Sequence, residues 1–387
     1  MVPGSELPGR RRVLLLSYDL DVWGAQRQLV ELAKGLDPIR HDVRVGVLAT
    51  DGALRTELDA AGIPVVDFAR SWRWDLAPIF RLRRYLKSEA IDVLHSFLFL
   101  PNFYARLGGR LAGTPAVVSS LRAVGIEGWP RFAADVATCF LCDAMVANSA
   151  AGAEHYIGHG GLRSRVVVIR NGFPPPPTVD TVALHQAATR WGLDRFRRRI
   201  GMIAALEPRK DQALLIRAFA QLSPSFPDTG LILAGGGAQR ESLERLIATL
   251  GVTANVVLLG KIHDSHLLHE LLDVYVQASF SGEGISNSIL EAMSHARPVV
   301  ATDVGGNKEV VVDNRTGYIV PAGDVDALAT RLRELLDDDA LRWRLGSDGQ
   351  HRVRTSFSVE QLVAATCEVY DRLLSATPLH ASVSATA

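Results

Sequence analysis

The chain has 387 residues, which is long for one hydrophobic core and comfortable for two domains. Hydrophobic residues make up 48% and charged residues 22% of it, the composition of a soluble globular protein. Lys plus Arg and Asp plus Glu both number 42, so the formal net charge is zero, whereas a general nucleic-acid binder carries a basic excess. We therefore expect no nucleic-acid partner.

The N-terminal segment carries some features of a secretion signal. Three arginines at 10–12 precede the apolar run 13–16, but Asp19 and Asp21 interrupt it and no small-residue cleavage site follows. A short buried strand is the better interpretation. No apolar run approaches the length needed to cross a bilayer, so we predict a cytoplasmic protein.

Short apolar runs rich in β-branched residues alternate with longer segments of helical period. In the first half we predict strands at 13–17, 43–48, 65–68, 93–96, 116–119, 144–147 and 166–169, with helices at, for example, 26–36, 54–61 and 76–89. Strands that are apolar on both faces indicate a parallel sheet with helices on both sides.

The three cysteines are too few and too irregular for a disulfide scaffold. Cys139 and Cys142 form a Cys-x-x-Cys pair inside an apolar stretch, 132–145, that we predict to be helical. Against a redox or metal-binding role for this pair, core packing is the favoured interpretation.

Residues 171–177 read Asn-Gly-Phe followed by four prolines, which can form neither a helix nor a central strand. The alternation then restarts, with strands predicted at 200–204, 230–234, 256–259, 274–276 and 298–301, and helices at 212–221, 240–250 and 286–295. The predicted fold is α/β, with two doubly wound Rossmann-like domains facing a central cleft.

We place the domains at 1–172 and 173–357. A C-terminal helix at about 358–374 is expected to pack back on the first domain, and the tail 376–387 is expected to be disordered.

The most informative segment, 279–293, follows a predicted strand, passes two glycines and enters a helix. Gly282 and Gly284 allow a sharp turn and a close approach to a ligand, and the open helix start suits a diphosphate. Glu283 lies before the helix and Glu291 about one turn inside it, so their carboxylates could hold hydroxyls of two different sugars. The alternative is a capped helix with one surface and one structural glutamate.

This segment resembles the E-x7-E signature of retaining glycosyltransferases of the GT-B fold, in particular glycosyltransferase family 4 (group 1). Residues 283–293 and 297–307 resemble that family almost continuously. The resemblance implies that Glu283 contacts the donor sugar and Glu291 the nucleotide ribose. It also implies further donor-binding residues at the helix start: Gly284, Ile285, Ser286, Asn287 and Ser288.

A second element carries cations that could neutralise a diphosphate, because the strand 200–206 is followed by Glu-Pro-Arg-Lys-Asp before a helix. The family usually has Arg-Leu, three residues and Lys here, and both cations stabilise the leaving nucleotide. Lys210 matches the lysine, but Ala205 stands at the arginine position. Arg209 is the candidate replacement, and a solvated loop charge is the alternative for both cations.

Two strand-end turns resemble the parts of the family site that lie near the nucleotide. The turn 233–237 yields Gly235 and Gly236 as donor-binding candidates, and the turn 259–262 yields Lys261 or Ile262 as the residue whose backbone meets the base. Without the resemblance, a strand-end glycine cluster indicates only a tight turn.

The loop 23–28 follows the first strand and resembles the family's Gly-Gly-Ala-Glu loop, with Trp23 replacing a glycine and Gln26 the acidic residue. Relatives use this loop against the donor phosphates, so the resemblance implies that Gly24 binds the donor. Trp23 could stack on an acceptor sugar or simply pack at the strand end.

Two further residues are acceptor-side candidates. His95 is predicted to end a strand at its carboxyl edge, where it is either structural or an acceptor contact. Arg122 occupies the place where many relatives have a histidine beside the reacting sugar. An arginine there suggests an anionic acceptor or phosphate binding.

Basic residues gather on the predicted helix 76–89, at Arg81, Arg83, Arg84 and Lys87. A solvated helix face is the default interpretation. Peripheral contact with the inner face of the membrane, useful if the acceptor is lipid-linked, is the alternative.

The function we predict is transfer of a sugar from a UDP- or GDP-sugar to a glycan or lipid-linked acceptor, in polysaccharide or glycoconjugate biosynthesis. The resemblance implies retention of configuration without a bound metal or other cofactor. One alternative is a non-catalytic nucleotide-sugar-binding partner, for which Ala205 is the best argument. The other is an NAD-type oxidoreductase, but its G-x-G-x-x-G fingerprint is absent after the first strand.

Overall fold

The computed structural model of the chain describes residues 10–49, 52–72, 75–122, 128–262 and 264–375. It divides into two compact units. The first runs to Gly172 and resumes at Val359, and the second is Phe173–Ser358. The tail 376–387, which we expect to be disordered, lies outside the described residues.

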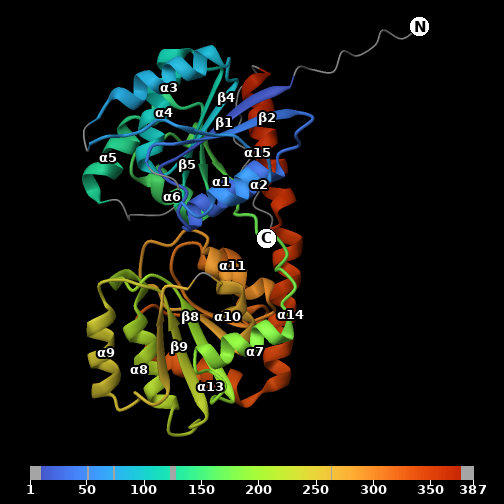
Figure 1. Ribbon diagram of the computed structural model, residues 1–387. Coiled ribbons are helices and arrows are strands. Elements are labelled where there is room, and N and C mark those ends of the chain that lie inside the picture. Colours follow the sequence, from blue (N-terminus) through green and yellow to red (C-terminus); the bar gives the residue numbers. More distant parts are fainter. Residues whose placement is uncertain (1–9, 50–51, 73–74, 123–127, 263, 376–387) are drawn as a thin grey trace. The chain divides into compact units, whose positions relative to one another are not determined.

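The first unit is a seven-stranded parallel sheet in the order β3-β2-β1-β4-β5-β6-β7, with helices on both faces (Figure 1). Its strands are β1 (Arg11–Ser17), β2 (His41–Val47), β3 (Val65–Asp67), β4 (Val93–Phe97), β5 (Ala116–Leu121), β6 (Ala144–Ala147) and β7 (Val166–Val168). Its helices are α1 (Gly24–Gly35), α2 (Arg55–Ala60), α3 (Ala77–Ser88), α4 (Phe99–Ala112), α5 (Trp129–Ala137), α6 (Ala150–Gly158) and α15 (Val359–Leu374).

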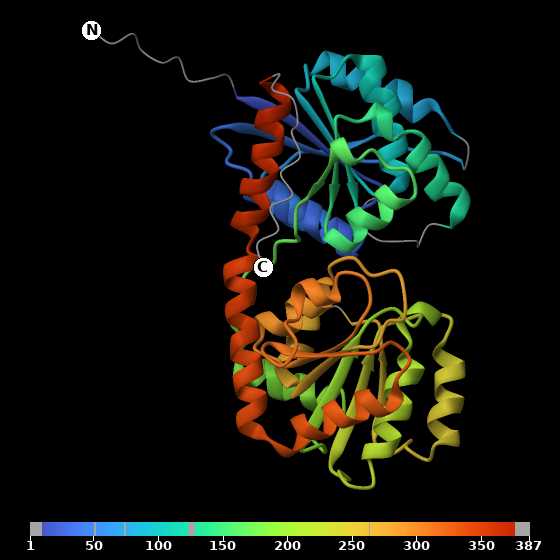
Figure 2. The same cartoon turned by 180° about the vertical axis from the view of Figure 1, so that it is seen from behind.

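The second unit is a six-stranded parallel sheet in the order β10-β9-β8-β11-β12-β13, again between helices (Figure 2). Its strands are β8 (Arg198–Ile203), β9 (Thr229–Ala234), β10 (Val256–Gly260), β11 (Val274–Gln277), β12 (Val299–Thr302) and β13 (Gly317–Val320). Its helices are α7 (Thr181–Arg190), α8 (Gln212–Leu222), α9 (Arg240–Thr249), α10 (Ser265–Leu271), α11 (Asn287–Ser294), α12 (Asn307–Val310), α13 (Val325–Asp337) and α14 (Asp339–Ser356).

Both sheets are buried on both faces because helices cover each side, and successive strand residues point alternately into the two cores. In β1, Val13 and Leu15 enter the core beneath α1 and α15, whereas Leu14 and Leu16 enter the core beneath α3 and α4. The predicted doubly wound α/β fold is confirmed by these two sheets. No helix in the described part of the chain is both long and apolar enough to cross a bilayer.

Two predictions about local structure need correction. The stretch 132–145 is not one helix, because α5 ends at Ala137, a short 3-10 turn spans Cys139–Leu141, and β6 begins at Ala144. Cys139 and Cys142 are buried free thiols, and Cys139 packs in a small core with Met145 and Tyr156. The strand β13 is absent from the predicted set.

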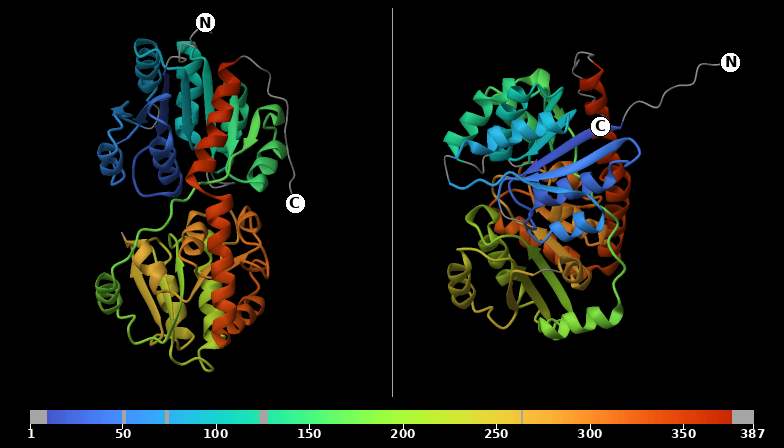
Figure 3. Two further views of the ribbon diagram at one scale, coloured as in Figure 1. Left: turned by 90° about the vertical axis from the view of Figure 1, so that its right-hand side faces the viewer. Right: turned by 45° about the horizontal axis from the view of Figure 1, so that its top comes forward.

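The helix α15 packs on the first unit although it follows the second in sequence (Figure 3). Leu362, Val369 and Tyr370 enter the core of that unit. The Tyr370 hydroxyl lies 2.7 Å from Nδ1 of His95 on β4, so a buried polar contact adds to the apolar packing.

We therefore predict that Tyr370→Phe destabilises the first unit, because His95 loses a buried hydrogen-bond partner at a cost of about 1–3 kcal/mol. Urea unfolding followed by fluorescence measures the change. Tyr18→Phe is the matched control, since Tyr18 is only partly buried. Equal unfolding midpoints for the two variants would contradict the role assigned to this contact.

Candidate functional site

The candidate site lies at the carboxyl ends of the strands of the second unit. Ligands of open parallel sheets bind where the strand order reverses. That point lies between β8 and β11, since β9 and β10 continue to one side and β12 and β13 to the other. The turn Pro208–Lys210 follows β8 and the loop 278–286 follows β11, so the two segments that carry most of the predicted site residues meet here.

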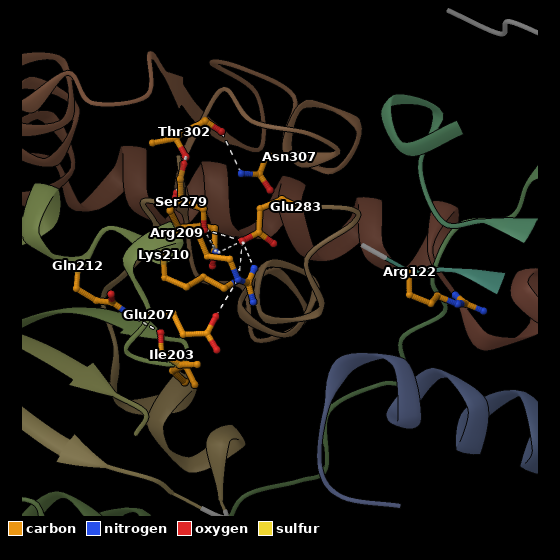
Figure 4. A network of polar contacts seen from close by, with 12 residues as sticks. Arg122, Ile203, Glu207, Arg209, Lys210, Gln212, Ser279, Glu283, Thr302 and Asn307 are labelled. Carbon is orange, nitrogen blue, oxygen red and sulfur yellow. Dashed lines mark hydrogen bonds and ion pairs between the residues drawn. The ribbon is translucent and has the colours of Figure 1, made fainter. Parts of the chain in front are cut away.

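Glu283 is the centre of a set of polar contacts (Figure 4). Its Oε1 atom lies 2.5 Å from Nζ of Lys210 and accepts a hydrogen bond of 2.6 Å from the Ser279 hydroxyl. The Gln277 amide lies 3.4 Å from the same oxygen. Glu283 is 6% exposed, so this ion pair is shielded from bulk water and is stronger than a surface pair.

Arg209 approaches the same carboxylate as Lys210. Its Nη1 atom lies 3.8 Å from Oε1 of Glu283, while its Nε donates to Glu207 at 2.8 Å. Ala205 contributes only its carbonyl oxygen, which accepts from the Gln212 amide at 2.9 Å. The structure thus brings Lys210, Arg209 and Glu283 together. That the Arg209 side chain faces Glu283 could not be predicted from its position next to Lys210 in the sequence.

The loop that carries Glu283 is held by its neighbours rather than by regular structure. The Thr302 hydroxyl at the end of β12 donates to the carbonyls of Gln277 and Ser279, and the Asn307 amide donates to the Thr302 carbonyl at 3.0 Å. Gly282 has a φ of +75°, in the left-handed region that favours glycine. These contacts and this turn hold the loop ahead of α11.

The start of α11 is suited to an anion. Ser286 is its N-cap residue but does not cap it through its side chain. Gly284, Ile285 and Ser286 are buried, and Asn287 and Ser288, the first two helical residues, are half-buried. Amide groups at a helix start carry partial positive charge, so this turn can receive phosphate oxygens.

Glu291 lies one turn further along α11 and is held from α10. The Ser265 hydroxyl donates to its Oε1, and Nε2 of the buried His269 lies 3.5 Å from its Oε2. Burial alone would raise the pKa of Glu291, but His269, Ser265 and His295 together lower it below its usual value. Glu291 therefore remains an ionised acceptor at neutral pH.

The two glycine turns near this edge lie on neighbouring strands. The Gly235 amide donates to the carbonyl of Gly260 at 2.7 Å, which ties the ends of β9 and β10 together. Gly236 faces the side chain of Lys261, and a Cβ placed on it would lie 3.1 Å from that side chain. Lys261 is exposed, whereas Ile262 packs against the core beneath α11.

The first unit holds the remaining candidates. Trp23 is 52% exposed and is the N-cap residue of α1, with Gly24 as the first helical residue. His95 is buried, and its ring nitrogens lie 2.7 Å from the Tyr370 and Ser120 hydroxyls. Burial and then Arg122 hold its pKa well below the ordinary value, so His95 is a neutral interior residue.

Arg122 is a buried cation with a polar but uncharged partner. It donates to the Asn171 side chain at 2.9 Å, and its guanidinium lies 4.7 Å from the Phe97 ring centre. Its Nε has no hydrogen-bond partner in the described part of the chain, and burial lowers its pKa to about 10. Such a group suits an incoming anion.

Sequence reasoning missed the residues that hold the two glutamates. They are Ser265, His269, Gln277, Ser279 and Thr302. Only Gln277 gave a readable signal, namely an amide at a position where a buried strand ordinarily carries an apolar side chain.

Two doubly wound parallel sheets in one chain, the second with its cations and glutamate at the switch point, are the architecture of GT-B glycosyltransferases. Residues 189–352 match the family described as Glycosyl transferases group 1. Residues 22–175 match the family described as Glycosyltransferase Family 4. The chain belongs to the glycosyltransferase group 1, or family 4, enzymes that these two descriptions cover.

Curated relatives match over part of their length. A putative glycosyltransferase of Bacillus subtilis, EpsD, is 34% identical over 43% of this chain and 43% of its own. A GDP-mannose-dependent alpha-(1-6)-phosphatidylinositol monomannoside mannosyltransferase of Mycolicibacterium smegmatis is 36% identical over 46% of this chain and 50% of its own. The chain thus spans about half the length of these relatives.

Solved structures match over nearly the whole chain. HepE of Anabaena in complex with UDP-glucose has a TM-score of 0.83 at 25% identity, over 93% of this chain and 99% of its own. WaaG, a glycosyltransferase involved in lipopolysaccharide biosynthesis, has a TM-score of 0.72 at 17% identity, over 92% of this chain and 99% of its own. The second likeness shows the fold alone.

The close packing of the Glu283 loop yields a prediction. Gly305 has a φ of +53°, and a Cβ placed there would collide with the Glu283 carbonyl oxygen. We expect Gly305→Ala to lower the free energy of unfolding by at least about 2 kcal/mol, because strain and overpacking add. Gly323 has a φ of +78° with no atom near its Cβ position, so Gly323→Ala should cost only about 1 kcal/mol. Urea unfolding compares them, and equal losses would contradict the packing argument.

Proposed function

We propose that this chain is a retaining glycosyltransferase that moves a sugar from a UDP- or GDP-sugar to a glycan or lipid-linked acceptor. The observation that carries the proposal is the convergence of Lys210 and Arg209 on the buried carboxylate of Glu283, at the switch point of the second sheet. Two similar proteins support this class of donor: HepE is solved in complex with UDP-glucose, and the Mycolicibacterium smegmatis enzyme is named as GDP-mannose-dependent.

The leaving diphosphate sets the main electrostatic demand of the reaction. Negative charge grows on its bridging oxygen as the bond to the anomeric carbon breaks. We assign Lys210, Arg209 and the amides at the start of α11 to this charge, because preorganised donors lower the barrier most when they are aimed at developing charge. Arg209 thereby takes the place that Ala205 leaves without a cation.

The acceptor hydroxyl attacks the anomeric carbon from the face that the diphosphate leaves. A new carbon–oxygen bond replaces the broken one, and the hydroxyl proton passes to a departing phosphate oxygen, so no enzyme nucleophile is needed. Glu283 orients the donor sugar by accepting hydrogen bonds from its hydroxyl groups. Glu291, ionised and held by Ser265, accepts from the ribose hydroxyls.

The first unit is assigned to the acceptor. Trp23 presents an exposed aromatic ring at the carboxyl edge of β1, which suits a sugar face. Arg122 is proposed to meet an anionic group of the acceptor or a donor phosphate. His95, with both ring nitrogens engaged, is reassigned from acceptor contact to positioning of α15 on the sheet.

A non-catalytic nucleotide-sugar-binding partner of the same fold is the rival function, and Ala205 is its main support. Turnover separates the two. A binding protein would take up a nucleotide sugar in calorimetry but release no UDP or GDP, with or without varied acceptors.

We predict that wild-type protein binds and turns over one member of a panel of UDP- and GDP-sugars, and that Lys210→Ala lowers kcat about 10²–10³-fold. Glu283→Ala should cost a similar factor, because the donor sugar loses its orienting carboxylate. Released nucleotide is measured with and without oligosaccharide or lipid acceptors. Arg333→Ala, on the exposed face of α13, is the control. Near wild-type rates for both site variants would overturn the assignment.

A lipid-linked acceptor would bring the chain to an anionic membrane, and α3 has a surface that fits one. Arg81, Arg83, Arg84 and Lys87 are exposed there, and the neighbouring Phe80 is 63% exposed. Basic residues beside an exposed aromatic ring are typical of contact with anionic lipid headgroups.

We expect the fourfold change of these basic residues to Glu to lower the affinity for phosphatidylglycerol vesicles at least tenfold, with donor hydrolysis unchanged. Vesicle co-sedimentation at low salt is the measurement. A control variant makes the same charge change on exposed residues of the second unit, at Arg217, Arg333, Arg344 and Arg354. Equal loss of binding in both variants would show a net-charge effect and defeat the proposed contact.

A further inference from the structure

A line of polar side chains runs along one face of β11, in the interior of the second unit. Val274 and Val276 point to the core beneath α8 and α13. Tyr275 points to the opposite core, beneath α10 and α11. Gln277 lies two residues further along the strand and therefore points to the same side as Tyr275. Tyr275, Gln277 and the following Ser279 are all completely buried.

These side chains form a directed chain of hydrogen bonds. The Tyr275 hydroxyl donates to Oε1 of Gln277 at 2.9 Å, and the Gln277 amide donates to the Ser279 hydroxyl at 2.9 Å. The Ser279 hydroxyl then donates its one proton to Oε1 of Glu283 at 2.6 Å. The Tyr275 hydroxyl also lies 3.4 Å from the Ile203 carbonyl oxygen. The Gln277 and Ser279 donors point toward the carboxylate, so its negative charge polarises these bonds.

The arrangement is costly unless it serves the site. Burying an amide is unfavourable without hydrogen bonds, and an apolar side chain of similar size would fill the same position in a parallel sheet without that cost. Among the described residues, the side-chain amide of Gln277 forms hydrogen bonds only with Tyr275, Ser279 and Glu283. Its partners therefore tie an interior strand to the carboxylate at the strand's carboxyl end.

The two carboxylate oxygens of Glu283 differ in their hydrogen-bonding partners. Lys210, Arg209, Ser279 and Gln277 all approach Oε1. Within the described residues, every hydrogen bond to the Glu283 carboxylate goes to Oε1, and Oε2 accepts none. One oxygen is thus committed to the protein and the other is left to accept from a ligand.

We propose that Gln277 is a positioning residue, which acts through Ser279 to hold Oε1 of Glu283 and so presents Oε2 to the donor sugar. The inference rests on the proposed function. Lys210 alone could pull the carboxylate toward itself, because a lysine ammonium is a point charge on a flexible stem. The bonds from β11 oppose that displacement, and they bind the orienting glutamate to a rigid strand.

The test compares Gln277→Met and Ser279→Ala with wild type. Methionine keeps the length of the side chain and its packing but removes the amide, and alanine removes only the hydroxyl. We expect each variant to lower kcat for donor hydrolysis and transfer at least tenfold, because a misplaced orienting group costs up to about 10²-fold. The donor KM and the dissociation constant for UDP or GDP should stay within about threefold, since Lys210 and Glu291 remain.

Two further variants sharpen the test. The double variant Gln277→Met/Ser279→Ala should be no slower than the slower single variant, because both break the same chain. Gln221→Met is the matched control, since Gln221 donates to Asp326 on an exposed helix face and should keep the wild-type kcat.

A folded Gln277→Met protein with wild-type kcat would overturn the inference and leave the proposed function standing. Equal losses of kcat, nucleotide affinity and thermal midpoint would show a purely structural role and also overturn it. Absence of turnover by the wild-type protein with every donor would overturn the proposed function, and the inference with it.

Discussion

The second unit is organised around the adjacency of β8 and β11. The strand order of its sheet places these two strands side by side, although Lys210 and Glu283 are 73 residues apart in the chain. The ion pair of 2.5 Å at their carboxyl ends forms because the strand order reverses at this point, which places β8 beside β11. Arg209 joins through the same turn, so one topological feature supplies both cations and the carboxylate.

The two signature glutamates are held by different means. Glu283 accepts from a chain of buried side chains on β11, whereas Glu291 is held from α10 by Ser265 and the buried His269. Both carboxylates therefore contact side chains that were not among the ligand-binding residues predicted from the sequence. Catalytic geometry depends on such supporting groups, because a small displacement of an orienting residue costs much of the rate.

In the first unit, His95 lies at the carboxyl edge of a strand but has a structural rather than a reactive environment. His95 is engaged on both ring nitrogens and joins α15 to the sheet. Arg122, next to it in space, keeps a buried charge with the Asn171 amide as its hydrogen-bonding partner. Of these two candidates, Arg122 therefore retains an unpaired donor within the described part of the chain and His95 does not.

The local pattern of apolar residues in the sequence was sufficient to predict much of the fold. Apolar runs with β-branched residues located the strands of both sheets apart from β13. The four prolines after Phe173 coincide with the change from one compact unit to the next. The Cys-x-x-Cys stretch has the apolar pattern of one helix, but it contains the end of α5, a 3-10 turn and the start of β6. Each of these pieces is too short for its own periodicity to be recognised.

The amino-acid sequence by itself determined the α/β class and the family, and it predicted the two glutamates and the lysine of the candidate site, because these depend on residue types at short, fixed spacings. Only the tertiary structure decided that Arg209 approaches Glu283, that His95 meets Tyr370, and that Gln277 supports Glu283 through Ser279. The physical reason is that a side chain's partner across a sheet comes from a strand or helix distant in the chain. Local periodicity indicates which face of an element a residue occupies, but not which residue of another element contacts it there.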